Sequence, residues 1–108
     1  MDIIKIEDIQ ALCSDQTIFM TQHAHDRCRE RGIKYKDLKS AISTGEIIEQ
    51  YPDDKPYPSC LLLGITVSSK PLHLVCSIGT GTLWIITAYW PDPQKWDSNF
   101  KIRKERST

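Results

Sequence analysis

Residues 60–90 read CLLLGITVSSKPLHLVCSIGTGTLWIITAYW, in which three apolar runs are separated by two short interruptions. The interruptions, at 68–70 and 79–81, are rich in serine, threonine and glycine, as turns are. We therefore expect strands over 60–67, 72–78 and 83–90. Because so few residues connect these strands, successive strands should lie antiparallel to one another.

The sequence before this meander predicts one further strand at 47–51 and, earlier, mostly helix. A loop at 52–58 contains three prolines, which excludes a central strand there. Apolar residues recur at helical spacing, and a short β-prone run precedes the second helix. The expected helices cover 2–13, 22–31 and 35–44, and the β-prone run covers 17–20. Thr21 can cap the second helix, and Gly32 can end it. The predicted fold class is α+β, with N-terminal helices packed on one face of a four- to five-stranded, mainly antiparallel sheet.

The chain has 108 residues, which fits a single domain over residues 1–108. We expect a core at about 17–97, an N-terminal helix within 1–15 and a basic tail at 97–108. The net charge is zero, but residues 27–39 contain six basic and two acidic side chains. Such clustering indicates either a local anionic partner or an ordinary solvated surface.

The four cysteines do not form a C-x-x-C pair, which argues against a zinc site and against a redox motif. Each cysteine lies among apolar residues, as buried reduced thiols do. The sequence has no basic segment followed by an apolar run at its start, and no apolar stretch of about 18 residues. We therefore expect a cytoplasmic protein that needs no metal or cofactor.

The predicted second helix places His23, Arg27 and Arg31 four residues apart, so that they form one stripe. Arginine binds phosphate in a bidentate manner, and a neutral imidazole can accept a proton at pH 7. The stripe therefore predicts a phosphate site. The alternative is a solvent-facing helix with an Arg27–Glu30 ion pair. His25 is expected to be a surface residue.

Further candidates lie on the predicted strands. Alternation places His73 on the face opposite Leu72 and Leu74, where a histidine is either structural or functional. Thr87 and Tyr89 share one face of the last strand, where they either bind a phosphate or simply fill the sheet. Histidine, arginine and tyrosine together suit one metal-free reaction, in which the 2′-OH of RNA attacks the neighbouring phosphate to give a cyclic phosphate.

Several separated motifs resemble a bacterial family catalogued as domain of unknown function forty-two fifty-eight. The first is an "H-A-x-x-R-x-x-x-R-G-I" pattern that begins at His23 and ends at Ile33. The match continues, in order, through 45–49, 71–75 and 85–89, and then Pro91-Asp92 and Trp96. The resemblance covers about residues 17–97, so the first helix and the basic tail lie outside it.

The resemblance implies a RelE-like fold, within the group that also contains barnase-, EndoU- and colicin-type nucleases. It implies a toxin-type RNA endonuclease, encoded beside a small zinc-finger or helix-turn-helix antitoxin. The catalytic residues would be His23, Arg27, Arg31, His73 and Tyr89. The substrate-binding residues would be Thr87, Arg29 and Lys34. The main alternative is a non-catalytic module that binds RNA or a protein on the same fold, and a weaker one is a structural or regulatory subunit.

Overall fold

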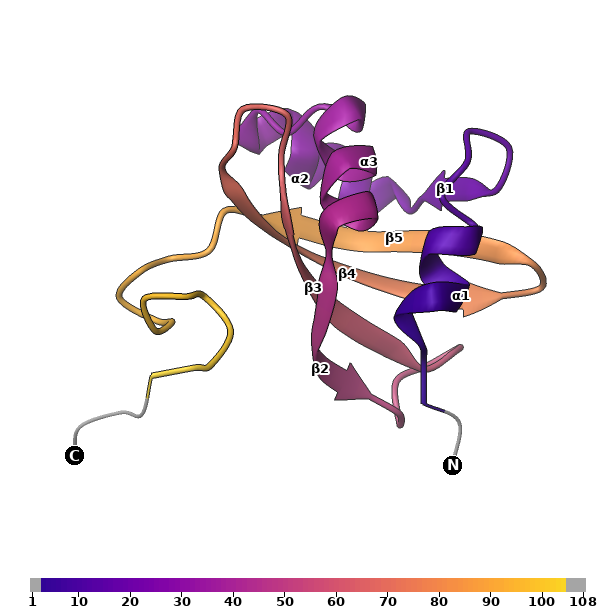
Figure 1. Ribbon diagram of the computed structural model, residues 1–108. Helices are drawn as coiled ribbons and strands as arrows, with labels where there is room; N and C mark the ends of the chain where they lie inside the picture. Colours follow the sequence, from indigo (N-terminus) through magenta and orange to yellow (C-terminus); the bar gives the residue numbers. More distant parts are fainter. Residues whose placement is uncertain (1–2, 105–108) are drawn as a thin grey trace.

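The computed structural model describes residues 3–104 and forms an α+β fold (Figure 1). Its elements are, in chain order, α1 (Ile6–Ala11), β1 (Ile18–Met20), α2 (Gln22–Arg31), α3 (Tyr35–Thr44), β2 (Glu46–Tyr51), β3 (Ser59–Ile65), β4 (Pro71–Gly79) and β5 (Thr82–Tyr89). The strands make one five-stranded sheet in the order β1-β5-β4-β3-β2. None of the helices in this part of the chain is long and apolar enough to cross a membrane.

The antiparallel meander is confirmed for β2 to β5, but the sheet as a whole is mixed. The short β1 lies parallel to β5, with Ile18 opposite Leu83. Strand β1 does not extend along the second half of β5, so that part of the edge carries no strand partner among the described residues. This free edge of β5 becomes important for the candidate site.

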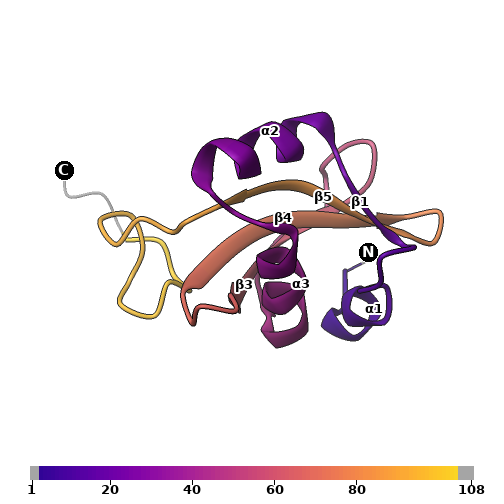
Figure 2. The same cartoon turned by 90° about the horizontal axis from the view of Figure 1, so that it is seen from above.

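Helix α2 begins and ends where its sequence predicts. The Thr21 hydroxyl accepts a hydrogen bond from the Ala24 amide at 3.0 Å, and Gly32 ends the helix in the left-handed region with φ of 68°. Ala24 and Cys28 are buried. Helix α2 packs along β5, and α3 packs across β3 (Figure 2).

Helix α3 lies so close to β3 that a side chain at Gly64 has no room. A Cβ atom built there would lie 1.9 Å from the Ala41 carbonyl oxygen. Glycine is therefore required at this position for α3 to reach the sheet. The contact buries Leu38 and Ile42 completely.

Helix α1 is shorter than the predicted 2–13, of which Asp2 lies outside the described residues. The helix has no side-chain cap at Lys5 and ends at Leu12. There the Thr17 hydroxyl donates to the Leu12 carbonyl at 2.7 Å, which satisfies that carbonyl outside the helix.

The two faces of the sheet are covered by different parts of the chain. The face beneath the helices carries the core residues of the central strands: Cys60, Leu62, Leu72, Leu74, Cys76, Ile85 and Ala88. His73 and Ser77 lie on the other face, as the alternation predicts, and they are buried there together with Leu61. Much of the cover there comes from residues 91–104 and the proline-rich loop. Trp96, at the end of the stretch that resembles the family, is only 3% exposed.

All four cysteines are free, and Cys13 is the only one that is not fully buried. Cys60 and Cys76 face each other across β3 and β4, with their sulfur atoms 3.9 Å apart. The burial of three thiols agrees with the sequence-based expectation.

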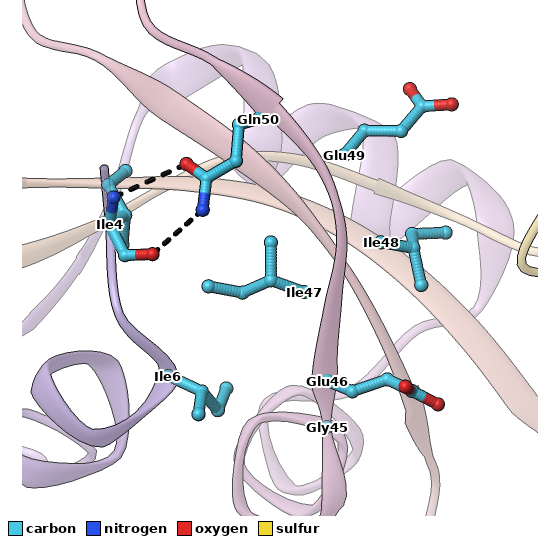
Figure 3. Close-up of a pocket in the computed structure, with 8 residues that line it drawn as sticks. All are labelled: Ile4, Ile6, Gly45, Glu46, Ile47, Ile48, Glu49 and Gln50. Atoms are coloured by element: carbon cyan, nitrogen blue, oxygen red, sulfur yellow. Dashed lines mark hydrogen bonds between the residues drawn. The ribbon is translucent and has the colours of Figure 1, made fainter. Parts of the chain in front are cut away.

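The N-terminal segment lies beside β2, on the side to which the Gln50 and Ile47 side chains point (Figure 3). The Gln50 side-chain amide donates to the Ile4 carbonyl at 2.8 Å and accepts from the Ile4 amide at 3.3 Å. Ile6 and Ile47 line the apolar hollow beside this pair.

Candidate functional site

A basic pocket of about 340 Å³ lies where β5 ends and the C-terminal segment begins. Its lining is Arg31, Tyr89, Trp90, Asp92, Lys95, Trp96 and Arg103. Its cations are Arg31, Lys95 and Arg103, of which Arg103 is paired with Glu49, and its one carboxylate, Asp92, accepts the Gln94 amide at 2.8 Å. Such a charge balance favours an anion. We call this hollow the basic pocket.

Arg31 reaches the basic pocket by folding over the free edge of β5. Its Nη1 donates to the Ala88 carbonyl at 2.8 Å, and the Trp90 indole donates back to the Arg31 carbonyl at 2.8 Å. These two bonds fix the end of α2 to the end of β5. The Ala88 bond uses one of the five N–H donors of the guanidinium, which leaves donors for a ligand.

Tyr89 and His73 lie directly opposite each other on β5 and β4. The Tyr89 hydroxyl is 3.2 Å from His73 Nδ1, and His73 Nε2 is 2.8 Å from the Phe100 carbonyl oxygen. Because a carbonyl only accepts, Nε2 carries the proton, and in the neutral ring Nδ1 accepts from Tyr89. Burial lowers the pKa of His73 below its ordinary value, which favours the neutral ring. Burial also raises the pKa of Tyr89.

Aromatic rings enclose the His73 imidazole. Trp96 meets it edge-to-face at 4.5 Å between ring centroids, and the imidazole has no exposed surface. Phe100 has a positive φ of 61°, which is rare for a bulky residue. The backbone strain at Phe100 coincides with the hydrogen bond that its carbonyl accepts from His73.

A second group of polar residues joins β2 to the C-terminal segment. Arg103 binds the Glu49 carboxylate through Nε at 2.9 Å and Nη2 at 3.1 Å, and its guanidinium lies 4.7 Å from the centre of the Trp96 ring. Tyr51 also donates to Glu49. Burial of the Glu49 carboxylate acts to raise its pKa. Hydrogen bonds from Arg103 and Tyr51 outweigh this effect and hold the pKa of Glu49 below its ordinary value. Burial and the bond to Glu49 raise the pKa of Tyr51 to about 12.

The stripe of His23, Arg27 and Arg31 follows β5 but does not converge on one point. At its start, the Thr21 amide donates to the Ile85 carbonyl at 3.1 Å, while at its end Arg31 binds Ala88. Eight residues of helix separate His23 from Arg31, which is about 12 Å. His23 is exposed and does not line the basic pocket.

Arg27, in the middle of the stripe, makes the ion pair that the alternative interpretation predicted. Its Nη1 lies 2.8 Å from a Glu30 carboxylate oxygen. Its Nε is buried and has no hydrogen-bond partner among residues 3–104. The ion pair does not decide between a solvated helix and a ligand site, because both side chains are partly exposed and such pairs contribute little stability.

The other predicted contacts lie away from the basic pocket. Arg29 is on the opposite side of α2, 74% exposed and 3.4 Å from Asp26. Lys34 precedes α3 and is exposed. Thr87 lies on the same face as Tyr89, opposite Val75. His25 is exposed, as expected.

The sequence-based candidates did not include several residues of the site: Glu49, Tyr51, Trp90, Asp92, Lys95, Trp96 and Arg103. The sequence indicated the basic tail, and the resemblance ended at Trp96, but neither predicted that this segment contacts His73. That contact depends on a turn of the C-terminal segment in which the Asp97 amide donates to the Ile102 carbonyl at 2.9 Å. Within the described range, no three His, Cys, Asp or Glu side chains are placed to hold a metal ion.

The fold and the site define a small α+β domain with a basic pocket that aromatic residues help to line. The chain belongs to the family described as Domain of unknown function (DUF4258), whose model matches residues 20–90. No curated protein and no solved structure gives a significant match to the chain. The family match includes His73, Tyr89 and Arg31 and ends before Lys95, Trp96 and Arg103.

Proposed function

We propose that this chain is a toxin-type, metal-independent RNA endonuclease that acts at the basic pocket. The observation that carries the proposal is the Tyr89–His73 hydrogen bond, placed beside Arg31, Lys95 and Arg103. A tyrosine hydroxyl coupled to a neutral imidazole can move a proton, and the three cations can bind a phosphate.

The scissile phosphate would lie in the basic pocket. Arg31 keeps four N–H donors beyond the one that binds Ala88, and Arg103 keeps its Nη1 group beyond the two nitrogens that bind Glu49. Guanidinium groups neutralise the charge that builds on the phosphorane oxygens. Trp90 and Trp96 form apolar walls that strengthen these interactions by excluding water.

The proton of the attacking 2′-OH would pass to the Tyr89 oxygen while the Tyr89 proton passes to His73 Nδ1. The 2′ oxygen then bonds to phosphorus and the bond from phosphorus to the 5′ oxygen breaks. The ammonium of Lys95 would donate a proton to the departing 5′ oxygen. The products are a 2′,3′-cyclic phosphate and a free 5′-OH, and solvent returns the two proton carriers to their starting states.

His23, Arg27 and Thr87 would bind RNA outside the reacting phosphate. His23 and Arg27 continue the line of Arg31 along the free edge of β5, and Thr87 lies next to Tyr89 on the sheet face. A strand of RNA along this edge would place several phosphates within reach of basic side chains. In this arrangement His23 acts in binding rather than as the partner of Tyr89 in proton transfer. Arg29 and Lys34 would contribute to the longer-range attraction of RNA.

The family resemblance supports two further parts of the proposal. The helices followed by an antiparallel meander suit a RelE-like fold, and such toxins are paired with small antitoxins of the zinc-finger or helix-turn-helix type. The antitoxin would cover the basic pocket and the α2 stripe, since both present positive charge.

A second candidate function is RNA binding without cleavage. It is favoured by the complete burial of His73, whose two ring nitrogens are both occupied. Because burial lowers the pKa of His73, the imidazole is a weak base. If His73 is purely structural, the basic pocket would bind RNA without cleaving it.

The two candidates are separated by incubating the purified chain with a labelled RNA oligonucleotide in the presence of a chelator and analysing the product ends. The endonuclease is supported if the RNA products carry cyclic phosphate ends and the rate at which these ends form falls on the order of 100-fold in Tyr89→Phe. Tyr35→Phe is the matched control, because Tyr35 is exposed and binds Asp15 on another part of the surface. RNA binding without products supports the second candidate, and the absence of both overturns the proposal.

A further inference from the structure

A second hollow of about 450 Å³ lies on the same sheet face as Tyr89, at the opposite end of β4 and β5. It is enclosed between the proline-rich loop and the two strands. Its lining is Thr21, Asp54, Lys55, Pro56, Tyr57, Ser77, Trp84 and Ile86. Two aromatic rings and the side chains of Thr21, Asp54 and Ser77, which carry oxygen, thus line a space that the proposed cleavage chemistry does not use.

The loop that forms one wall is held in place by its own contacts. Asp54 accepts from the Ser59 hydroxyl at 2.6 Å and from the Lys55 amide at 2.9 Å. The Tyr57 ring lies directly on the backbone of Gly79, where an added Cβ would come within 2.5 Å of the ring. The aromatic wall is therefore positioned before any ligand arrives, which reduces the entropy lost on binding.

The hollow offers stacking and hydrogen bonding together. Tyr57 and Trp84, which line the hollow, carry aromatic rings of the kind on which unstacked nucleobases stack. The Asp54 carboxylate uses two of its roughly four acceptor sites within the loop, so further sites stay open to an N–H donor. The Ser77 hydroxyl can donate or accept. An aromatic wall with a carboxylate suits a base that carries an exocyclic amino group.

The position of the hollow relative to the basic pocket fits one strand of RNA. Ser77 pairs with Trp84 in the sheet just as His73 pairs with Tyr89. Four residues along β4 separate the two pairs, which is about 13 Å at about 3.3 Å per residue. This separation corresponds to about four nucleotides at the ~3.4 Å rise of a stacked strand, and fewer in an extended strand.

Helix α2 connects the two hollows along the same edge. Thr21, which precedes α2, lines the hollow between the loop and the strands, and Arg31 lines the basic pocket. The stripe of His23, Arg27 and Arg31 runs between them. A backbone that follows this stripe with a phosphate at Arg31 brings a nearby base to the entrance beside Thr21.

We propose that this hollow is a nucleobase subsite that selects an amino-bearing base over uracil, close to the site of cleavage. The inference rests on the proposed RNA-directed function and specifies the source of its sequence preference. The uracil edge presents two carbonyl oxygens around its N–H group, and the Asp54 carboxylate repels them. Adenine, cytosine and guanine each present an amino group without that pattern.

The test uses free nucleosides, which carry no phosphate and therefore report on the subsite without the basic pocket. The full chain, labelled with nitrogen-15, is titrated with cytidine, adenosine, guanosine and uridine up to about 10 mM, tenfold above a dissociation constant of about 1 mM. The expected result is a saturable shift of the Trp84 indole N–H with the three amino-bearing nucleosides. Trp90 and Trp96, in the basic pocket, serve as internal controls and should not shift.

Two variants sharpen the result. Asp54→Asn replaces an acceptor by a group that can also donate, and it should remove the discrimination against uridine. Tyr57→Leu should abolish the Trp84 shift for every nucleoside, because stacking is lost on one side. Equal shifts for uridine and cytidine in the unmodified chain, or no Trp84 shift with any nucleoside, would overturn the inference.

The same measurements remain interpretable if the chain does not cleave RNA. Nucleoside binding at Trp84 without RNA cleavage contradicts the endonuclease but retains the subsite. RNA cleavage that depends on Tyr89, without any Trp84 response, contradicts the subsite but retains the endonuclease. In an active chain, RNA hexamers that differ at one base should differ about tenfold in cleavage rate, in line with ~1–3 kcal/mol per recognised base.

Discussion

Tyr89 and His73 face each other across β5 and β4, with the tyrosine hydroxyl 3.2 Å from the imidazole Nδ1. The other ring nitrogen donates to the Phe100 carbonyl, which belongs to the C-terminal segment. A segment outside the family match at residues 20–90 therefore fixes the tautomer of a histidine inside it. The pKa of His73 should therefore report whether the C-terminal segment is packed against the sheet.

Trp96→Ala should destabilise the fold by about 3 kcal/mol, since truncating a buried tryptophan removes many packing contacts. Trp96 is 3% exposed and packs against His73. The loss is measured as a lower free energy of unfolding in urea, and NMR titration should show the pKa of His73 returning toward its ordinary value. Phe19→Ala is the control, with a loss below about 1 kcal/mol, because Phe19 is 50% exposed. Equal losses in the two variants would contradict the buried position of Trp96.

Stability should fall as the pH is lowered through about 6.5, the ordinary pKa of histidine. Burial lowers the pKa of His73 in the folded chain, although the Phe100 carbonyl and Glu49 act in the opposite direction and Arg103 adds to the lowering. The unfolded state therefore binds a proton at a higher pH than the folded state, and the free energy of unfolding rises with pH in this window. The window is distinct from that of Glu49, whose pKa is lowered below 4.5.

The control for the pH effect is His73→Asn, which removes the titrating group. Its absolute stability is expected to be lower, since the ring fills a buried position. The informative quantity is the slope of the unfolding free energy between pH 5 and about pH 7, which should flatten in the variant. An unchanged slope would assign the effect to another group.

The local elements were predictable because short-range signals define them. Thr21 and Gly32 mark the two ends of α2 by hydrogen bonding and backbone conformation, and both act within one helical turn. Alternation in 72–78 identified the buried face of β4. The family resemblance was confirmed by the match over residues 20–90.

The composition of the site was less predictable, because distant segments create it. Lys95, Trp96 and Arg103 come together at the basic pocket only after the C-terminal segment turns back, and Glu49 reaches Arg103 from β2. The helical stripe was visible, but spacing on a helix does not reveal that its two ends lie beside different hollows. Sequence periodicity describes one element at a time, whereas these relationships depend on how α2 lies along β5.

Arg31→Ala should weaken RNA binding and lower the slope of log affinity against log salt by about 0.7, the value for one phosphate contact on a single strand. Arg31 lines the basic pocket and is held there by Ala88. Arg29→Ala is the matched control, since it removes the same charge from the opposite side of α2. Fluorescence anisotropy at several salt concentrations measures both. If the two variants behave alike, RNA does not use the basic pocket.

Gly64→Ala should be much more destabilising than Gly81→Ala. The added methyl group at Gly64 meets the backbone of Ala41, which cannot move without lifting α3 from β3. Gly81 has φ of 73° and open space around it, so alanine there brings only backbone strain, about 1 kcal/mol. Thermal unfolding followed by circular dichroism measures both variants. Similar melting temperatures would contradict the close approach of α3 to the sheet.

The pairing of Gln50 with Ile4 has a consequence for how copies of the chain behave toward one another. Strand β2 lies at the edge of the sheet, and unprotected edge strands are templates for pairing with a second chain. The Gln50 amide occupies both polar groups of the Ile4 backbone and holds the N-terminal segment against the face of β2 that Gln50 and Ile47 share. The side chain of Gln50, five non-hydrogen atoms, thus keeps the N-terminal segment beside the edge strand, where it obstructs the approach of a second chain from that face.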